Sequence, residues 1–361
     1  MVNQNYEAAS PRAYSIILKF MDEDRLTNNE QETEEERVIN LSLRPKYLSD
    51  FIGQKDIISA LKIAIEATKQ REEPLEHVLL SGPPGLGKTS LAYCIAREMN
   101  AKFTATSGPA VERAGDLVGI LTNLEKGDIL FIDEIHRLPK VVEEFLYPAM
   151  ENFQIDFIID KGPYAKSVKF NLKPFTLIGA TTRKGMLSGP LRGRFGLFYD
   201  FDFYEIDDLA MVVRRSSEIL NVPIDAVSAD EIARRSRGSP RLCNRLLRRV
   251  RDYAQVRGNG IIDLSTAKNA LNEIKVDSEG LDDLDRKYLK TIVQLYSGGP
   301  TGIEAIAASL AEDKGTMEDV VEPYLLKKGF IIRSPRGRIA TESAYKHLNL
   351  PYPLNPKNIS M

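Results

Sequence analysis

The sequence has no tryptophan, only two cysteines and three histidines, and no apolar run near the ~20 residues of a membrane-spanning helix. The N-terminus also lacks the basic stretch and apolar core of a secretory signal. Without such a signal, Cys94 and Cys243 are predicted to be reduced core thiols rather than a disulfide. The scattered histidines give no Cys/His spacing typical of zinc. We therefore expect a cytoplasmic protein with no membrane association.

What the chain does contain is unevenly placed charge. Its 361 residues are 43% hydrophobic and 28% charged, which allows two or three domains with their own cores. Residues 22–36 carry eight acidic residues against one basic residue, Arg25, and predict a solvated, disordered extension. Basic residues concentrate at 234–257 and at 327–338, and the second range contains no acidic residue. The net charge of -2 therefore does not exclude a nucleic-acid partner.

Residues 81–90, "SGPPGLGKTS", fit the phosphate-loop pattern G-x-x-x-x-G-K-[ST], with Gly82, Gly87, Lys88 and Thr89 in place. A β-prone run, "HVLLS", precedes the loop, and a stretch with helical spacing follows it. Glycines let backbone N–H groups face phosphates, Lys88 would reach the β and γ phosphates, and the Thr89 hydroxyl would ligate Mg²⁺. A chance Gly-rich turn would not be framed by a strand and a helix. The loop predicts a nucleoside triphosphate site.

A second motif, "DILFIDEIH" at 128–136, places two carboxylates after four apolar residues. This pattern predicts a buried parallel strand whose C-terminal end faces the ligand. Asp133 would organise the Mg²⁺ shell, and Glu134 would orient or deprotonate the attacking water. The competing interpretation is an exposed acidic turn. His136 by itself indicates a structural or relay residue rather than a metal ligand.

A third strand-like run, "FTLIGATTR" at 175–183, ends in hydroxyls that are suited to sensing a γ-phosphate. "GPLRGRFG" at 189–196 then places Arg192 and Arg194 in a Gly/Pro-flanked loop that is poorly suited to a buried core. An arginine finger from a neighbouring subunit can supply positive charge to phosphoryl transfer. Taken alone, such a pair is more often a surface feature, but its position after the sensor-like strand favours the finger.

The remaining patterns predict an α/β fold with appended domains. We expect an extension at 1–40, a large parallel-sheet ATPase domain at 41–207, a small helical lid at 208–278, a winged helix at 279–350 and a tail at 351–361. Alternation in 153–175 predicts a β-hairpin, which is either an ordinary insertion or a partner-docking element. In the helix expected at 240–256, we expect Arg245, Arg248 and Arg249 to be solvated or paired with neighbouring subunits, with Arg241 as the exception.

The C-terminal basic cluster lies on the expected wing. "SPRG" between two β-prone runs is a natural turn, and Arg333 and Arg338 flank it with no acid nearby in the sequence. Winged helices mediate protein contacts as well as DNA binding, so the fold alone leaves both open. Exposed arginines favour phosphate contacts, and we expect these two to bind DNA without sequence preference.

Together these motifs resemble a known family. "GPPGLGKTSLA", "FIDEIHRLPK", "LIGATTR" and "PLRGRFG", in this order, resemble the AAA+ ATPases and, more narrowly, the RuvB motors of Holliday-junction branch migration. "LRPKYLSDFIGQ" (43–54), "GSPRLCNRLLRRVRDYA" (238–254) and "GFIIRSPRGRIAT" (329–341) support the resemblance, which covers residues 41–350.

The resemblance implies ATP/ADP and Mg²⁺ as ligands and a role for each matching position. The implied nucleotide contacts are Leu43, Arg44, Gly85, Lys88, Thr89, Ser90, Glu151, Asn152, Phe153, Tyr204 and Arg241. Asn152 departs from the usual Glu-Asp-aromatic pattern of its segment. The implied catalytic residues are Lys88, Asp133, Glu134, the first sensor Thr182 and the trans-acting finger Arg194, with Arg241 as the second sensor on the lid.

The implied function is a homohexameric ring that drives duplex arms of a Holliday junction held by RuvA, in recombination, repair and the SOS response. The hairpin near 154–173 would dock on RuvA, and the RuvC resolvase would be an indirect partner. A clamp-loader-type AAA+ switch is the main alternative, although it would end in a helical collar rather than a wing. A nucleotide-responsive promoter-binding regulator is another. A two-RecA-domain helicase conflicts with the single phosphate loop.

Overall fold

The computed structural model describes residues 34–158 and 167–353. The acidic extension up to residue 33, the predicted Gly-Pro turn of the hairpin and most of the tail lie outside the described residues. The chain folds into two compact units. One contains residues up to Gly82 together with Gly87–Phe201, and the other contains Pro83–Leu86 together with the residues from Asp202 onward.

The first unit contains a five-stranded sheet in which all neighbouring strands are parallel. Its strand order is β2-β3-β6-β1-β7. The strands are β1 Val78–Ser81, β2 Phe103–Ser107, β3 Ile129–Asp133, β6 Thr176–Thr181 and β7 Leu197–Asp200. The three apolar runs predicted to be strands are therefore confirmed as β1, β3 and β6. Continuous apolar sequence is what a strand covered on both faces requires, and β1 and β6 are buried along their whole length.

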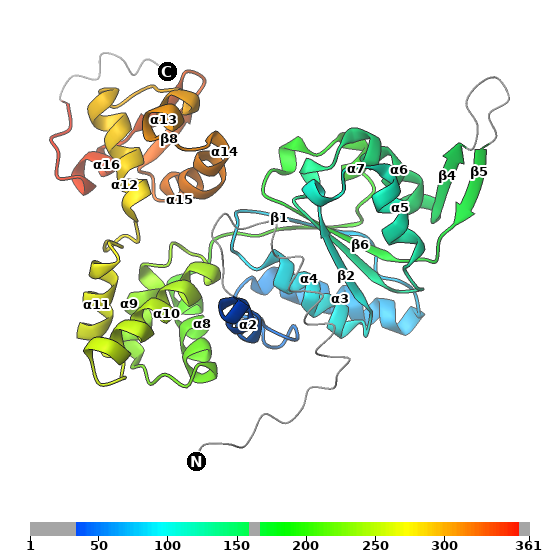
Figure 1. The fold of residues 1–361 in the computed structure, drawn as a ribbon, viewed down its shortest axis with the longest axis horizontal. Coiled ribbons are helices and arrows are strands. Elements are labelled where there is room, and N and C mark those ends of the chain that lie inside the picture. The colour runs from blue at the N-terminus through cyan, green and yellow to red at the C-terminus, as the bar shows by residue number, and fades with distance from the viewer. Residues whose placement is uncertain (1–33, 159–166, 354–361) are drawn as a thin grey trace. The chain divides into compact units, whose positions relative to one another are not determined.

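Helices cover both faces of this sheet (Figure 1). The helices α3 Lys55–Arg71 and α4 Lys88–Glu98 lie on one side, and α5 Ala114–Thr122, α6 Lys140–Asn152 and α7 Gly189–Arg192 lie on the other. Alternate strand residues such as Leu79, Leu130, Ile132 and Leu177 pack with α5 and α6 in one core cluster. The helix α2 Glu34–Leu43 includes the last residues that we had assigned to the extension.

The predicted hairpin is confirmed as an antiparallel pair outside the main sheet. It consists of β4 Gln154–Ile158 and β5 Ser167–Asn171, with Gln154 opposite Asn171. Figure 1 shows the pair extending away from the five-stranded sheet. The ribbon is a sheet of its own, although Ile155 of β4 is buried in the core cluster of the first unit and anchors the ribbon there.

The second unit begins with a helical region that confirms the predicted lid. Its helices are α8 Ile206–Ile219, α9 Ala226–Arg234, α10 Pro240–Arg257 and α11 Leu264–Glu273. The Ser239 hydroxyl caps α10 by accepting from the Leu242 N–H at 3.5 Å. Cys243 on α10 and Cys94 on α4 are buried and are not joined in a disulfide, as predicted. Burial raises the pKa of Cys243 to about 12.

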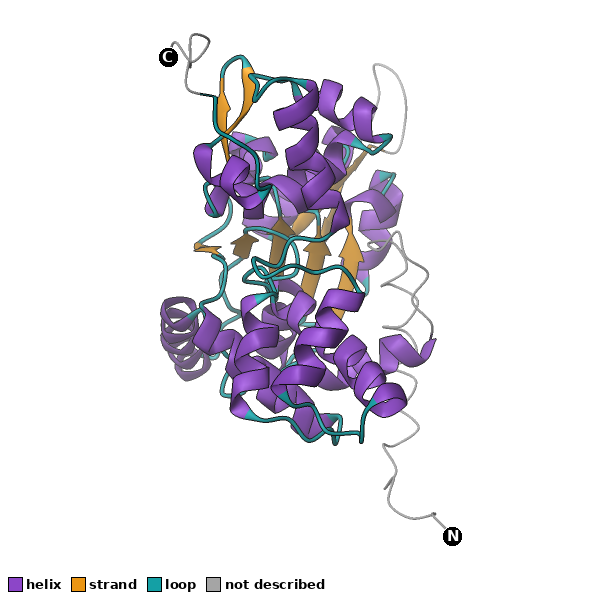
Figure 2. Ribbon diagram, turned by 90° about the vertical axis from the view of Figure 1, so that its left-hand side faces the viewer, coloured by secondary structure: helices purple, strands orange, loops and turns teal. Residues whose placement is uncertain are grey.

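The rest of this unit is a winged helix, also as predicted (Figure 2). Its elements are α12 Asp283–Lys290, a π-helical turn Thr291–Leu295, α13 Ile303–Leu310, α14 Lys314–Thr316, a second π-helical turn Met317–Val321, α15 Glu322–Lys327, β8 Ile331–Ser334, β9 Gly337–Ala340 and α16 Glu342–His347. Ser334 pairs with Gly337, so Pro335 and Arg336 form the tip of the wing. No helix among the described residues is long and apolar enough to cross a membrane.

Candidate nucleotide site and nucleic-acid interface

The phosphate loop has the backbone that a phosphate cradle needs. Gly82, Gly85 and Gly87 all have positive φ, at 138°, 78° and 100°. A Cβ on Gly82 would lie 2.6 Å from the Phe201 carbonyl oxygen, so both the conformation and the space require glycine there. Within the described chain no side chain caps α4, whose first turn carries Thr89 and Ser90. That helix end presents N–H groups and a favourable field to an anion.

Lys88 is buried at the start of α4 and its Nζ donates to the Gly82 carbonyl at 2.8 Å. This contact keeps the ammonium group over the loop. An anion in the loop would meet a lysine, a helix N-terminus and glycine N–H groups together. The residues present therefore fit the triphosphate that the sequence predicted.

The carboxyl end of β3 brings the two predicted acids out of the sheet in different directions. The Asp133 side chain accepts from the N–H of Glu134 at 2.9 Å. Beside it on β2, in register with Asp133, lies Ser107, whose buried Oγ has no hydrogen-bond partner among the described residues. Carboxylate and hydroxyl oxygens are the ligands that Mg²⁺ prefers, so Asp133 and the Thr89 hydroxyl suit that ion chemically.

Glu134 turns away from the strand in a left-handed conformation, with φ of 47°. Its Oε2 accepts from the Thr182 hydroxyl at 3.3 Å and lies 3.3 Å from His136 Nδ1. Thr181 Oγ1 lies 2.9 Å from the same ring nitrogen and accepts from the Arg183 N–H at 3.0 Å. The structure thus gathers two predicted residues, Glu134 and Thr182, with His136 and Thr181.

Sequence reasoning left His136 and Thr181 without assigned sites. The signal for both was present, because "DEIH" and "ATTR" end neighbouring parallel strands, whose carboxyl ends meet at one edge. Both hydroxyls suit a sensor, and the resemblance implied this role for Thr182 alone. A sequence cannot show which of two adjacent hydroxyls faces the carboxylate.

The other nucleotide contacts implied for the first unit are spread over two segments. Leu43 is buried at the end of α2, followed by the half-buried Arg44. Glu151 and Asn152 are exposed in the last turn of α6. Phe153 caps that helix, and its ring packs edge-on against Phe175 at 5.8 Å. The Phe153 side chain is partly buried and packs against the core cluster of its own chain.

Arg194 is not in the exposed loop that we expected. Residues Gly189–Arg192 form α7, and the Arg194 side chain is only 20% exposed. Its Nη2 lies 2.9 Å from Glu151, its Nη1 donates to the Pro190 carbonyl at 2.6 Å, and its guanidinium lies 4.4 Å from the Tyr147 ring centre. The expectation failed because buried Leu191 and Phe195 anchor both ends of this segment in the core.

In the second unit, Tyr204 and Arg241 both lie close to the phosphate-loop residues that belong to that unit. The Tyr204 hydroxyl donates to the Leu86 carbonyl at 3.2 Å. The Gly85 carbonyl accepts from the Arg241 N–H at 3.3 Å and from the Ser239 hydroxyl at 3.1 Å. The Arg241 side chain is exposed. Sequence reasoning missed Ser239, although a serine before proline at a helix start is a recognisable capping signal.

The wing arginines do have an acid beside them, contrary to expectation. Glu322 on α15 is fully buried, and it pairs with Arg333 and, at 2.6 Å, with Arg338. Arg338 also lies 3.5 Å from Glu318 and is 15% exposed, whereas Arg333 is 49% exposed. Hydrogen bonds from both arginines and Tyr288 keep the pKa of Glu322 below its ordinary value although burial opposes this. The Glu322 carboxylate lies outside the basic sequence cluster, and only folding brings it there.

Two lid arginines outside α10, for which the sequence suggested no individual role, are engaged within the chain. Arg235 and Arg237 are buried within their own chain. Arg235 bonds inside the lid, to Glu231 at 2.7 Å and to the Val276 carbonyl at 2.9 Å. Arg237 bonds to Asp285 at 2.7 Å.

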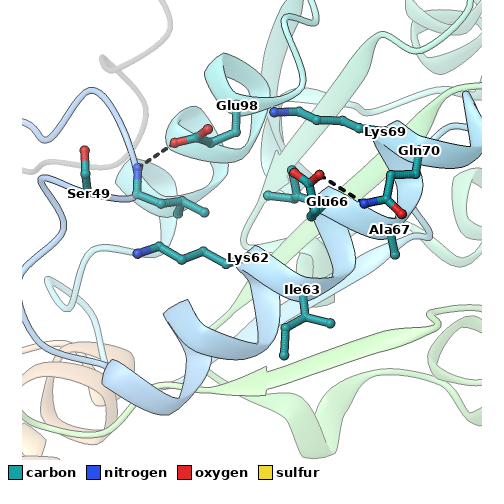
Figure 3. A pocket seen from close by; sticks show the side chains of 10 residues that line it. Ser49, Lys62, Ile63, Glu66, Ala67, Lys69, Gln70 and Glu98 are labelled. Carbon is teal, nitrogen blue, oxygen red and sulfur yellow. Dashed lines mark hydrogen bonds between the residues drawn. The ribbon is translucent and has the colours of Figure 1, made fainter.

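A pocket apart from these residues lies along α3 (Figure 3). Its lining includes Ser49, Lys62, Ile63, Glu66, Ala67, Lys69, Gln70 and Glu98. The Leu48 N–H donates to Glu98 at 3.1 Å and the Gln70 amide to Glu66 at 3.2 Å. None of the predicted site residues lines this pocket, so it is separate from the nucleotide site.

Comparison with known proteins matches three family models in succession. Residues 43–201 match the Holliday junction DNA helicase RuvB P-loop domain, residues 204–277 the RuvB AAA lid domain, and residues 278–349 the RuvB C-terminal winged helix domain. Among solved structures, the Thermotoga maritima RuvB Holliday junction branch migration motor is 50% identical with a TM-score of 0.80, covering 86% of this chain and 100% of that one. A point mutant of the same protein is 50% identical with a TM-score of 0.81, covering 86% and 99%.

Proposed function

The chain belongs to the RuvB family of Holliday-junction branch-migration motors, and from this we propose that it is a homohexameric ring ATPase that drives duplex DNA through a junction. ATP hydrolysis would provide the free energy, and the reaction would serve recombination and repair in the cytoplasm, including the SOS response. The match spans the ATPase, lid and winged-helix regions.

The observation that carries the proposal is the grouping of Glu134, Thr182 and His136. They lie at the carboxyl ends of β3 and β6, in the sheet whose strand β1 leads into the phosphate loop. Glu134 would orient and deprotonate the attacking water, and Thr182 would hold its carboxylate. Lys88 would bind the β and γ phosphates. Thr89 and Asp133 would hold Mg²⁺, which supplies positive charge to phosphoryl transfer when bound.

The remaining nucleotide roles are assigned by their placement. Tyr204 and Arg241 would report the nucleotide from the second unit, since both bond to phosphate-loop residues. Arg194 would act on the nucleotide of a neighbouring subunit, because in its own chain it is held by Glu151. The other proposed contacts are Leu43, Arg44, Gly85, Ser90, Glu151, Asn152 and Phe153.

DNA would be bound by the winged helix through phosphates rather than bases. Arg333 is half exposed beside the tip, and the exposed Arg336 is at the tip itself. Arg338 would mainly support the wing, since its guanidinium is engaged by Glu322 and Glu318. The β4–β5 hairpin would dock on RuvA, and RuvC would act on the same junction. The winged helix after the lid supports a motor over the clamp-loader alternative.

A synthetic four-way junction with labelled arms tests the function. We expect the protein to convert it into duplex products with ATP and RuvA, and the Glu134→Gln variant to bind ATP without doing so. ATP hydrolysis by wild-type protein with no movement of the junction in the presence of RuvA would contradict the motor function and favour a switch.

A further inference from the structure

The turn between α9 and α10, residues 235–239, contacts the phosphate loop on one side. The Ser239 hydroxyl donates to the Gly85 carbonyl at 3.1 Å, and the Gly238 carbonyl accepts from the Tyr204 N–H at 2.9 Å. Tyr204 in turn bonds to Leu86. Any change in the loop backbone at Gly85 and Leu86 therefore reaches this turn through direct hydrogen bonds.

On its other side the same turn contacts the winged helix through Arg237. This residue has φ of 50° and its side chain is 8% exposed. Its Nε donates to the Gly280 carbonyl at 2.9 Å, and its two terminal nitrogens bond to Asp285 at 3.0 and 2.7 Å. It also pairs with Asp282. A bidentate guanidinium–carboxylate pair fixes both distance and orientation.

The partners of Arg237 are the residues that begin the first helix of the winged helix. Asp282 caps α12 by accepting from the Asp285 N–H at 3.1 Å, and Asp285 accepts from the Asp282 N–H at 2.9 Å. Arg237 therefore bonds to the capping box of α12, which sets where that helix starts. The Asp285 side chain is 1% exposed, so solvent screens this attachment little.

A second contact runs parallel to the first. The Phe203 ring packs edge-on against Tyr324 of α15 at 6.2 Å, and it lies 4.9 Å from the Lys327 ammonium. A Cβ on Gly238 would lie 2.7 Å from the Phe203 Cβ, so the ring fits directly against the turn. Phe203 is next to Tyr204 in the chain. Ser239 and Tyr204, which contact the phosphate loop, therefore each lie within two residues of a side chain that contacts the winged helix, Arg237 and Phe203.

We propose that Arg237 is a positioning residue that couples nucleotide state to DNA binding, by attaching the capping box of α12 to the turn that contacts Gly85. The proposal rests on the proposed function, since it assumes that one chain binds both ATP and duplex DNA. A change at the phosphate loop then alters the orientation of the winged helix instead of being absorbed between two loosely joined domains. Coupling of this kind is reciprocal, because each ligand changes the affinity of the protein for the other ligand by the same factor.

The test compares duplex affinity in a non-hydrolysable ATP analogue with duplex affinity in ADP, on full-length protein. We expect the two affinities of the wild-type protein to differ by about 5-fold or more. In Arg237→Lys, the ratio of the two affinities should move toward one. Lysine keeps the charge but loses the bidentate geometry and the bond to Gly280. Asp285→Asn tests the same attachment from the winged-helix side, and it should change the ratio in the same direction.

Arg235→Lys is the matched control. Arg235 is equally buried two residues away, but its bonds stay within the lid, to Glu231, Asn272 and Val276. It should leave the ratio unchanged, and ATP turnover without DNA should stay within about twofold of wild type in all three variants.

Three results would overturn the proposal: a wild-type ratio of one, an unchanged ratio in both Arg237→Lys and Asp285→Asn, or an equal loss in Arg235→Lys. Failure of the proposed function would look different, since a wild-type protein that does not move junctions still gives a measurable ratio on plain duplex.

Discussion

Glu134 leaves β3 in a left-handed backbone conformation, and that turn directs its carboxylate toward Thr182 and His136. Asp133, one residue earlier, bonds back to the Glu134 N–H. Two adjacent acids are thereby separated into different environments. In the proposed mechanism, Asp133 would then serve Mg²⁺ and Glu134 would serve the attacking water.

Replacing Glu134 by Gln should separate ATP binding from hydrolysis. Glutamine keeps the size of the side chain and can still accept from Thr182, but it cannot take a proton from water. Turnover should fall by about 10²-fold or more while ATP affinity is kept. Lys88→Ala should instead lose both, because the phosphates lose their main side-chain partner. Steady-state hydrolysis and equilibrium ATP binding measure the two effects, and wild-type turnover in Glu134→Gln would show that another residue activates water.

Thr182→Val should lower kcat by roughly 10-fold, because the carboxylate of Glu134 loses a hydrogen bond that orients it. The matched control is Thr176→Val at the start of β6, the strand that Thr182 directly follows. There the hydroxyl donates to the Leu75 carbonyl at 2.6 Å. The control should cost about 1 kcal/mol of stability and leave kcat unchanged. Equal kcat losses in the two variants would assign Thr182 a purely structural role.

At the scale of elements, the wing shows that a sequence can predict a local turn but not the ion pairs formed across the fold. Its turn is local: "SPRG" between two β-prone runs predicts the hairpin, and Ser334 does pair with Gly337. The ion pairs are not local, because Glu322 is 11 residues from Arg333 and 16 from Arg338 along the chain. A charge cluster in the sequence therefore predicted a free basic surface, while folding brought a buried carboxylate beneath it.

Arg338→Ala and Arg336→Ala should differ in what they damage. Removing Arg338 leaves Glu322 buried with less compensation and should cost about 3 kcal/mol of winged-helix stability. Removing the exposed Arg336 should leave stability unchanged and make the logarithmic salt dependence of duplex binding shallower by roughly one unit. Thermal unfolding and a salt series on two unrelated duplexes measure these effects. An unchanged salt slope in Arg336→Ala would place the DNA contact elsewhere.

His77 ties β6 to α6, because its Nδ1 accepts from the Leu177 N–H at 2.9 Å and its Nε2 lies 3.1 Å from the Met150 carbonyl. These bonds need a neutral ring, and burial lowers the pKa of His77 below its ordinary value of 6.5. The unfolded chain therefore binds the proton more tightly. The stability from His77 is fully present above pH ~6.5 and is lost as the pH falls below it toward the folded-state pKa.

Denaturant unfolding at pH 7.5 and 5.5 should reveal this loss in the wild type. His77→Gln should be less stable at pH 7.5 and lose less on acidification, since other titrating groups contribute equally to both proteins. An identical pH dependence in the two proteins would contradict the assignment.

At the scale of the whole molecule, the order of strand, loop and helix predicted the parallel sheet, the helical lid and the winged helix. Hydrophobic periodicity and turn residues are local features, so a single sequence is enough to predict helices, strands and turns from them. The attachment of Arg237 to Asp285 did not emerge, because it joins residues 48 positions apart and both types are ordinarily solvent-exposed. The exposed position predicted for Arg194 was wrong for a different, local reason, because its neighbours Leu191 and Phe195 are buried and anchor the segment.

In the proposed ring, Arg194 would also link one subunit to the next. Its guanidinium is held by Glu151 and the Tyr147 ring, so the finger is pre-positioned on its own subunit. Arg194→Ala should lower ATP turnover on the order of 10³-fold, while the exposed neighbour Arg192→Ala should not. Wild-type turnover by Arg194→Ala alone would contradict the assignment.

Mixing subunits then distinguishes a finger that acts in trans from one that acts in cis. Arg194→Ala and Lys88→Ala proteins should each be inactive alone, for different reasons. A mixed ring contains some interfaces at which an intact phosphate loop meets an intact finger, so partial ATP turnover should return on mixing. A finger in cis allows no such recovery, because every subunit with a working loop would lack its own arginine. Turnover measured across mixing ratios should therefore pass through a maximum between the two inactive proteins, and recovery at any ratio is incompatible with a cis-acting Arg194.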